Sequence, residues 1–166
     1  MGLITSSIFP NGGERGSGGG IVQVVSVEDH VARTYNINNT KHTTSLQAAI
    51  ALSDSSNKVL IMYNVNNGGS NSYGGVYYGL VRGTTELVTA SITDAFGSVN
   101  PSGSSNGNHQ STNFPITYVD SPGTTSSTTY KVQIFGISGC NNHYFNRSNN
   151  YGDSGRSHLI LMELCS

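Results

Sequence analysis

The segment SHLILMEL, residues 157–164, decides the fold class of this chain. Successive side chains of a β-strand point to opposite faces of its sheet, so the segment carries two sets of side chains. Both sets are apolar: Leu159 and Leu161 on one face, and Ile160, Met162 and Leu164 on the other. A strand that has one face in water carries polar residues on that face. This strand therefore needs a cover on each side.

Short apolar runs separated by turn residues fill the chain from residue 21 onward. They occupy residues 21–27, 45–52, 58–66, 75–83, 86–92, 114–120, 128–137 and 143–147. The alanines of 45–52 also suit a helix, but the β-rich neighbours favour a strand. About nine or ten short strands, with a turn every 8–12 residues or so, are typical of an antiparallel β-sandwich or barrel. The sequence therefore predicts an all-β fold, an antiparallel β-sandwich.

The two apolar faces of 157–164 further predict an oligomer. One face meets the core of the sandwich, and a single domain of 166 residues without a long helix offers no second cover. Another subunit is the expected cover, so Leu161→Asp should leave an unassembled, aggregating monomer. Glu163 is expected to be an ordinary carboxylate at the wet end of this strand, near Lys131, without a catalytic role.

A flexible attachment arm is predicted for residues 1–20, ahead of a β-sandwich domain at residues 21–166. Six of the ten residues 11–20 are glycine, so this stretch should behave as a tether. The apolar tip of the arm carries the predicted virion-attachment residues Leu3, Ile4, Ile8 and Phe9. An apolar tip on a tether suggests a docking peptide, although a disordered terminus is the commoner state of a free chain end.

Composition argues against several classes of partner. Charged residues make up 10% of the chain and the net charge is −1, so no basic patch indicates a nucleic acid. No stretch approaches the roughly 20 apolar residues that insertion into a membrane needs. The two cysteines, Cys140 and Cys165, are expected to be small apolar side chains, with a bridge between them as the alternative.

Five segments resemble a known family in their order along the chain. They are GIVQVVSV at 20–27, SSNKVLIMYNV at 55–65, YVDSPGTTSSTTYKVQI at 118–134, FNRS at 145–148 and SHLILMEL at 157–164. Together they resemble a small β-sandwich domain of virion structural proteins from tailed bacteriophages, particularly those of marine and cyanobacterial hosts. These segments are signatures of a fold rather than of catalysis.

The resemblance implies a non-enzymatic, jelly-roll-like module that forms a homotrimer. The expected function is that of a virion surface protein, which decorates or cements a capsid or forms a short knob, and which docks through its N-terminal arm. Its expected partners are copies of itself and the major capsid protein or another virion protein. Its expected location is the virion, assembled in the host cytoplasm. Folds of this kind carry many functions, so the fold alone fixes none.

A receptor-binding tail-fibre tip that recognises host-surface glycan is the alternative. Loops at 67–75, 93–113 and 148–156 set aromatic residues among Asn, Ser and Gly, which suits stacking on a sugar ring. The residues expected to face a glycan are Tyr73, Phe96, His109, Phe114 and Tyr151. In any one loop, however, such residues are more often filler. The segment 93–113 has no periodicity and is predicted to be one long loop.

An enzyme is the least favoured class. The sequence contains no nucleophile elbow, zinc motif or phosphate-binding loop. A depolymerase would need two facing carboxylates, and the spacing indicates no such pair. A metal site of His143, Asp153 and His158 lacks a recognised ligand spacing. We therefore predict no catalytic residue, no metal and no cofactor, and we assign Asn146 and its neighbours to the shaping of a turn.

Overall fold

The computed structural model of this protein describes residues 2–7, 20–70, 75–91, 93, 95, 98–99, 112–139, 142–147 and 155–166. Within those ranges there is no helix, and hence none long and apolar enough to cross a membrane. All strand-to-strand pairings in the same ranges are antiparallel. The predicted all-β class with antiparallel sheets is therefore confirmed.

The strands of the described residues are numbered in chain order. They are β1 (Gly2–Ser7), β2 (Ile21–Asp29), β3 (Arg33–Tyr35), β4 (Lys41–Ile50), β5 (Lys58–Ser70), β6 (Val76–Arg82), β7 (Thr85–Val88), β8 (Ser98–Val99), β9 (Thr112–Asp120), β10 (Thr128–Gly136), β11 (His143–Phe145) and β12 (Ser157–Leu164).

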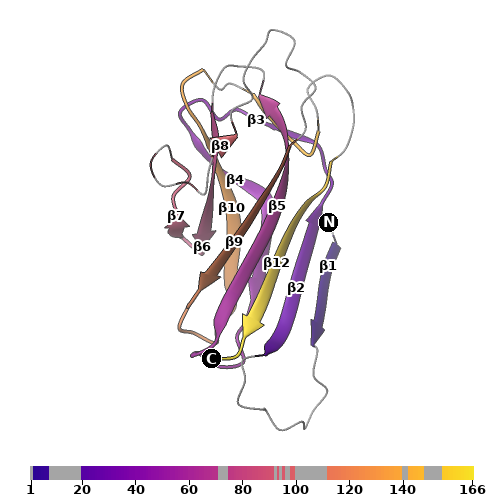
Figure 1. Cartoon of the computed structure of the whole chain (residues 1–166), viewed down its shortest axis with the longest axis vertical. Coiled ribbons are helices and arrows are strands. Elements are labelled where there is room, and N and C mark those ends of the chain that lie inside the picture. Colours follow the sequence, from indigo (N-terminus) through magenta and orange to yellow (C-terminus); the bar gives the residue numbers. More distant parts are fainter. Residues whose placement is uncertain are drawn as a thin grey trace.

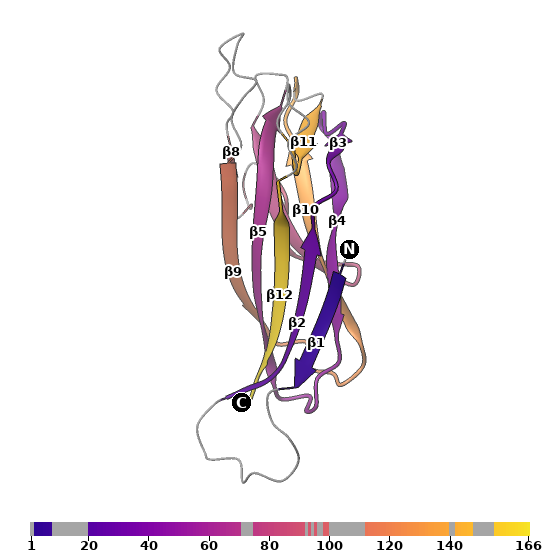
Figure 2. The same cartoon turned by 90° about the vertical axis from the view of Figure 1, so that its right-hand side faces the viewer.

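These strands form two sheets that face each other (Figures 1 and 2). Sheet A has the order β1-β2-β12-β5-β11-β3, and β9 also pairs with β5. Sheet B has the order β4-β10-β6-β7, and β8 also pairs with β6. Strand β5 pairs first with β12 and then, further along, with β11. Both views place β9 and β1 at opposite edges of sheet A, with β12 near the middle.

Eight of the strands make a nested set of pairs. The earliest strand of the set pairs with the latest, β2 with β12, and the next inward pairs are β4 with β10, β5 with β9, and β6 with β7. Successive pairs belong to sheets A, B, A and B. The last strand of the chain consequently lies in the interior of sheet A, between β2 and β5. Strand β12 is thus hydrogen-bonded on both sides, to β2 and to β5.

The core lies between the two sheets and is built from alternate residues of their strands. In β4, Leu46, Ala48 and Ile50 are buried while Gln47 and Ala49 are exposed, which confirms a strand rather than a helix at this segment. The other large core side chains that are fully buried are Ile37, Ile61, Tyr78, Leu80, Tyr130, Ile134, Phe145, Leu159 and Leu161. Residues of both sheets appear in this set, so a single core joins them.

The predicted strands at 75–83 and 86–92 are present as β6 and β7, which form a hairpin. Arg82 lies opposite Thr85, and only Gly83 and Thr84 separate them. Gly83 has a φ of 57°, a left-handed conformation that glycine adopts without steric cost. The sequence did not predict β1, β3 or β8. Strands β3 and β8 have only three and two residues, and β8 falls inside the segment 93–113 that was predicted to be loop. Strand β1 lies in the stretch that was predicted to be a flexible arm.

Part of the predicted arm is a strand. In β1, Leu3 and Ile4 lie opposite Val27 and Ser26 of β2, so this end of the arm extends sheet A by one strand. The other two predicted attachment residues, Ile8 and Phe9, lie outside the described residues.

Candidate assembly surface

The two faces of β12 have different surroundings. Leu159 and Leu161 have no exposed surface and lie in the core between the sheets. Ile160, Met162 and Leu164 point to the other side of sheet A and are half-buried. The inner pair is thus fully covered within one subunit, and only the outer residues are available to a second one.

An apolar row crosses the outer face of sheet A. Directly paired residues of neighbouring strands lie on the same face, so the pairing register defines such rows. The row runs through β2, β12, β5 and β9 as Val24, Met162, Leu60 and Val119. Half of the surface of Val119 (50%) is exposed. No described strand lies in front of this face (Figure 1).

The neighbouring rows show where the apolar area ends. The next row is Ser26, Ile160, Met62 and Thr117, of which Met62 is 38% exposed. The row beyond it is Glu28, His158, Asn64 and Pro115, and Glu28 also pairs with Arg156. The outer face therefore changes from apolar to polar along the strands, and the apolar end is the one near the C-terminus (Figure 1).

The outer face of sheet B has a different composition. Its corresponding row runs through β4, β10, β6 and β7 as Gln47, Lys131, Val81 and Glu86. Three of these four residues are polar or charged, and Glu86 also accepts hydrogen bonds from Lys41 Nζ at 2.8 Å. This row of sheet B is therefore mainly polar, in contrast to the apolar row of sheet A.

Glu163 is fully buried, which corrects the prediction of a carboxylate at the wet end of β12 near Lys131. Its Oε1 accepts hydrogen bonds from the backbone N (2.8 Å) and Oγ (2.7 Å) of Ser53 and from Nδ2 of Asn57 (2.6 Å). Its Oε2 accepts one from Nε2 of Gln23 (2.6 Å). Strand alternation already put Glu163 on the face of Leu159 and Leu161, so its parity was the signal that the prediction overlooked.

These contacts decide the charge state of Glu163. Burial raises the pKa of this carboxyl, but the hydrogen bonds from Asn57, Ser53 and Gln23 favour the charged form and together lower the pKa below its usual value. The charged carboxylate thereby joins the end of β12 to β2 and to the connection between β4 and β5. Asn57 extends the same junction, because its Oδ1 accepts a hydrogen bond from the backbone N of Ser166 at 3.1 Å.

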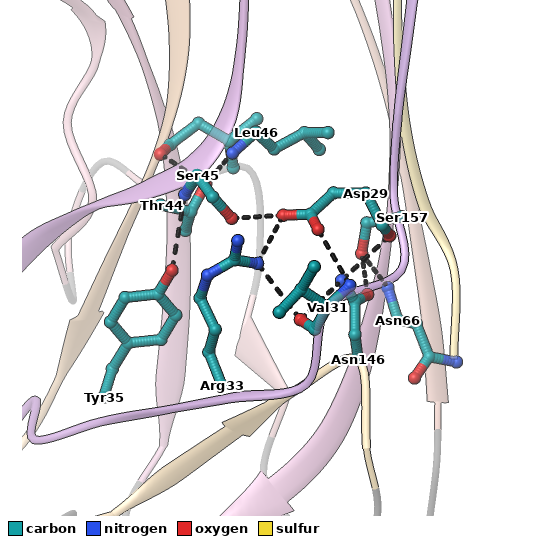
Figure 3. Close-up of polar contacts among 11 residues, drawn as sticks. Asp29, Val31, Arg33, Tyr35, Thr44, Ser45, Leu46, Asn66, Asn146 and Ser157 are labelled. Carbon is teal, nitrogen blue, oxygen red and sulfur yellow. Dashed lines mark hydrogen bonds and ion pairs between the residues drawn. The ribbon is translucent and has the colours of Figure 1, made fainter. Parts of the chain in front are cut away.

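A second buried carboxylate, Asp29, ends β2 and is 2% exposed. Arg33 Nη1 donates to its Oδ2 at 2.6 Å, the backbone N of Val31 donates to its Oδ1 at 2.9 Å, and Ser45 Oγ donates to its Oδ2 (Figure 3). Burial raises the pKa of Asp29, but the hydrogen bonds from Ser45, Arg33 and Val31 outweigh it and lower the pKa below its usual value. The carboxylate thus connects sheet A to β4 of sheet B.

Asn146, which was assigned to the shaping of a turn, continues this junction through bonds to residues distant in the sequence. It is fully buried and has a φ of 57°, a left-handed conformation that asparagine tolerates better than most residues. Its Nδ2 donates to the carbonyl oxygen of Asp29 at 2.9 Å, and its Oδ1 accepts from Ser157 Oγ at 2.6 Å (Figure 3). Ser157 Oγ in turn accepts from the backbone N of Asn66 at 2.9 Å. The turn after β11 is therefore tied to β2, β12 and β5.

Asp120 connects the two sheets at the end of β9. Arg82 Nη1 lies 2.9 Å from each of its carboxylate oxygens, and the Tyr130 hydroxyl donates to Oδ2 at 2.7 Å. Burial and the neighbouring carboxylate both raise the pKa of Tyr130, so its hydroxyl keeps the proton that it donates. This arrangement fits a structural link between β9, β6 and β10.

Most of the residues predicted to face a glycan lie outside the described residues: Tyr73, Phe96, His109 and Tyr151. Phe114 lies in β9 rather than in a loop. Its ring is stacked on the fully buried Tyr78, with 4.9 Å between the centroids, and packs against the core. The Phe114 ring therefore contributes to the fold at this end of the sandwich.

The histidines weighed for a metal site do not converge. His143 is fully buried, with its ring edge-on to Tyr78, whereas His158 is on the outer face of sheet A beside Glu28. Asp153 lies outside the described residues, and within those residues no cluster of three or more His, Cys, Asp or Glu side chains could hold a metal ion. Cys165 is a free, half-buried cysteine, and Cys140 is not among the described residues.

No protein-family model matches this chain, and no curated protein matches it.

Proposed function

We propose that this chain is a non-enzymatic structural protein of a bacteriophage virion surface, and that it acts as a homotrimer assembled through the outer face of sheet A. The apolar row of Val24, Met162, Leu60 and Val119 is the observation on which this rests. Contiguous apolar surface on a soluble domain is typical of an interaction site. The corresponding row of sheet B is mainly polar.

The position of the row favours contact at one end of the subunit. The apolar residues lie near the C-terminus, and the same face becomes polar toward Glu28 and His158. Subunits that meet at the apolar end leave the polar end of the face hydrated. The trimer itself is what the family resemblance implies. In a closed ring of three, each copy turns this face toward the threefold axis and meets two neighbours there.

The nested pairing supports a jelly-roll topology. When the earliest strand pairs with the latest and successive pairs alternate between sheets, the chain has the path of one long hairpin rolled into a sandwich. Jelly rolls form viral capsid and lectin domains. The fold thus suits a virion component, although the function rests on the surface rather than on the topology.

Sedimentation equilibrium tests the assembly. The wild-type protein is expected to have three times the 17.5 kDa mass of one chain. Met162→Lys puts a charge into the apolar row and is expected to give a folded single copy. Gln47→Lys is the matched control on sheet B and should leave the trimer intact. A wild-type protein that sediments as one copy at tens of micromolar would contradict the proposed function.

Copurification with capsids tests the site of attachment. We propose that the arm docks on the major capsid protein or on another virion protein through residues that follow β1, among them Ile8 and Phe9. Deletion of residues 1–12 is then expected to abolish copurification, whereas the apolar row of sheet A still holds the trimer. Binding of the isolated trimer to host cells, blocked by host polysaccharide, would instead support the receptor-binding alternative.

A further inference from the structure

Among the described strands, β1 pairs with β2 only. All six of its residues, Gly2–Ser7, pair with β2, from Glu28 at one end to Gln23 at the other. Among the described strands, no other has extensive contact with β1. It lies at the edge of sheet A in both views (Figures 1 and 2). The backbone pairing of β1 is therefore confined to the edge of sheet A that β2 forms.

The connection between β1 and β2 is much longer than the pairing requires. Two antiparallel strands are joined by as few as about two residues in a hairpin. Residues 8–20, thirteen in all, separate Ser7 from Ile21, and six of them are glycine. Fully extended, a segment of this length spans up to about 45 Å. The five strands β1, β2, β12, β5 and β9 of sheet A together are only about 20 Å across. The extended connection is longer than this width, so it can reach past the edge of its own subunit.

The edge of β2 accepts any copy of β1 equally well. A β1 strand from a second copy makes the same main-chain hydrogen bonds with β2 as the strand of its own chain. The two arrangements thus differ mainly in the entropy of the connection and in the local concentration of the second copy. Assembly through the outer face of sheet A raises that concentration, because Val24 of β2 belongs to the apolar row.

We propose that β1 is an exchanged strand, which pairs with β2 of a neighbouring copy in the assembled protein. This inference rests on the proposed trimer, which supplies the neighbour. The exchange links the subunits by main-chain hydrogen bonds in addition to the side-chain contacts of the apolar row. Exchange of an identical element between protomers is a low-cost route to such a link.

Disulfide trapping between two single-cysteine chains tests the exchange. Ile4 and Ser26 are directly opposed, and opposed residues of antiparallel strands have Cα atoms about 4.5–5.5 Å apart, within the range of a disulfide. Both variants carry Cys140→Ser and Cys165→Ser. A tagged Ile4→Cys chain and an untagged Ser26→Cys chain are refolded together and oxidised. Exchange predicts a covalent heterodimer, because neither chain can form this disulfide alone.

The control pair is Ile4→Cys with Gln47→Cys, in which the second cysteine lies on sheet B and should give no heterodimer. The double variant Ile4→Cys/Ser26→Cys completes the test. If it forms only an internal disulfide and the mixed chains form none, exchange is overturned. The absence of any disulfide in either sample overturns it as well. Sedimentation of the same samples separates the two proposals: a trimer with internal disulfides refutes exchange and leaves the proposed function standing.

Discussion

The inner and outer faces of β12 carry similar side chains and have opposite roles. Leu159 and Leu161 contact the core of their own subunit, and Glu163 on the same face is held by four hydrogen bonds. Ile160 and Met162 on the other face belong to the apolar surface of sheet A. An apolar strand face therefore indicates that the face is buried, but it does not indicate whether the same subunit or another copy buries it. One face is covered by sheet B, and we propose that the other is covered by a second copy.

The largest expected effect is that of truncating the inner face. Leu161→Ala should lower the free energy of unfolding by about 2–5 kcal/mol, because it opens a cavity among fully buried side chains. Chemical denaturation of the variant and of Met162→Ala, its neighbour on the outer face, measures the difference. Equal losses for the two variants would show that the two faces are not distinct.

The position of Leu161 also changes the meaning of Leu161→Asp. From the sequence, this substitution was expected to leave unassembled monomer. Since Leu161 is fully buried within the subunit, a charge there is expected to unfold the subunit itself. Met162→Lys is therefore the substitution that tests assembly.

Removal of the buried carboxylate comes second. Glu163→Leu should lower the free energy of unfolding by about 1–3 kcal/mol, because the donors on Gln23, Ser53 and Asn57 lose their acceptor. Glu163→Gln retains the shape and one acceptor oxygen, and it should cost less. Thermal unfolding of the two variants at neutral pH measures this order. A Leu variant as stable as wild type would show that Glu163 contributes nothing to holding β12.

Acid should lower the free energy of unfolding of the subunit. The pKa values of Glu163 and Asp29 are both lowered in the folded protein. Their contributions to stability are therefore complete above the unfolded-state pKa values of about 4, and are lost as the pH falls through the lower folded values. Unfolding measured from pH 6 down to pH 2 should show this decline, and Glu163→Gln should reduce it. An unchanged pH profile in that variant would assign the decline to other groups.

The smallest expected effect on the stability of the single subunit is that of a substitution on the outer face. At protein concentrations low enough to separate the copies, Met162→Lys should change the free energy of unfolding by no more than about 0.5–1 kcal/mol. Denaturation at several protein concentrations measures this value. Under assembling conditions the wild type should gain stability with concentration and Met162→Lys should not. A free energy of unfolding of the wild type that does not depend on protein concentration would contradict assembly through the outer face.

Strand existence and face assignment could largely be predicted from local pattern. Residues 157–164 form β12 over the predicted range, and Leu46, Ala48 and Ile50 share the buried face of β4 as their spacing indicates. Strands β3 and β8 could not be predicted, because they have only three and two residues and exist through pairing with β11 and β6. The candidate surface was predicted only in part: Met162 was recognised, while its partners Val24, Leu60 and Val119 depend on register.

By itself, the sequence determined that β12 is apolar on both faces, because alternation is a local property of the chain. Only the tertiary structure decided which face meets the core, since β12 is placed by pairing with β2 and β5, strands distant in the sequence. The same long-range packing brought Ser53, Asn57 and Gln23 around Glu163 and made a buried anion of a residue that looked solvent-exposed. Hydrogen bonds between segments far apart in the chain have no local signature, and for that reason they appear only in the folded molecule.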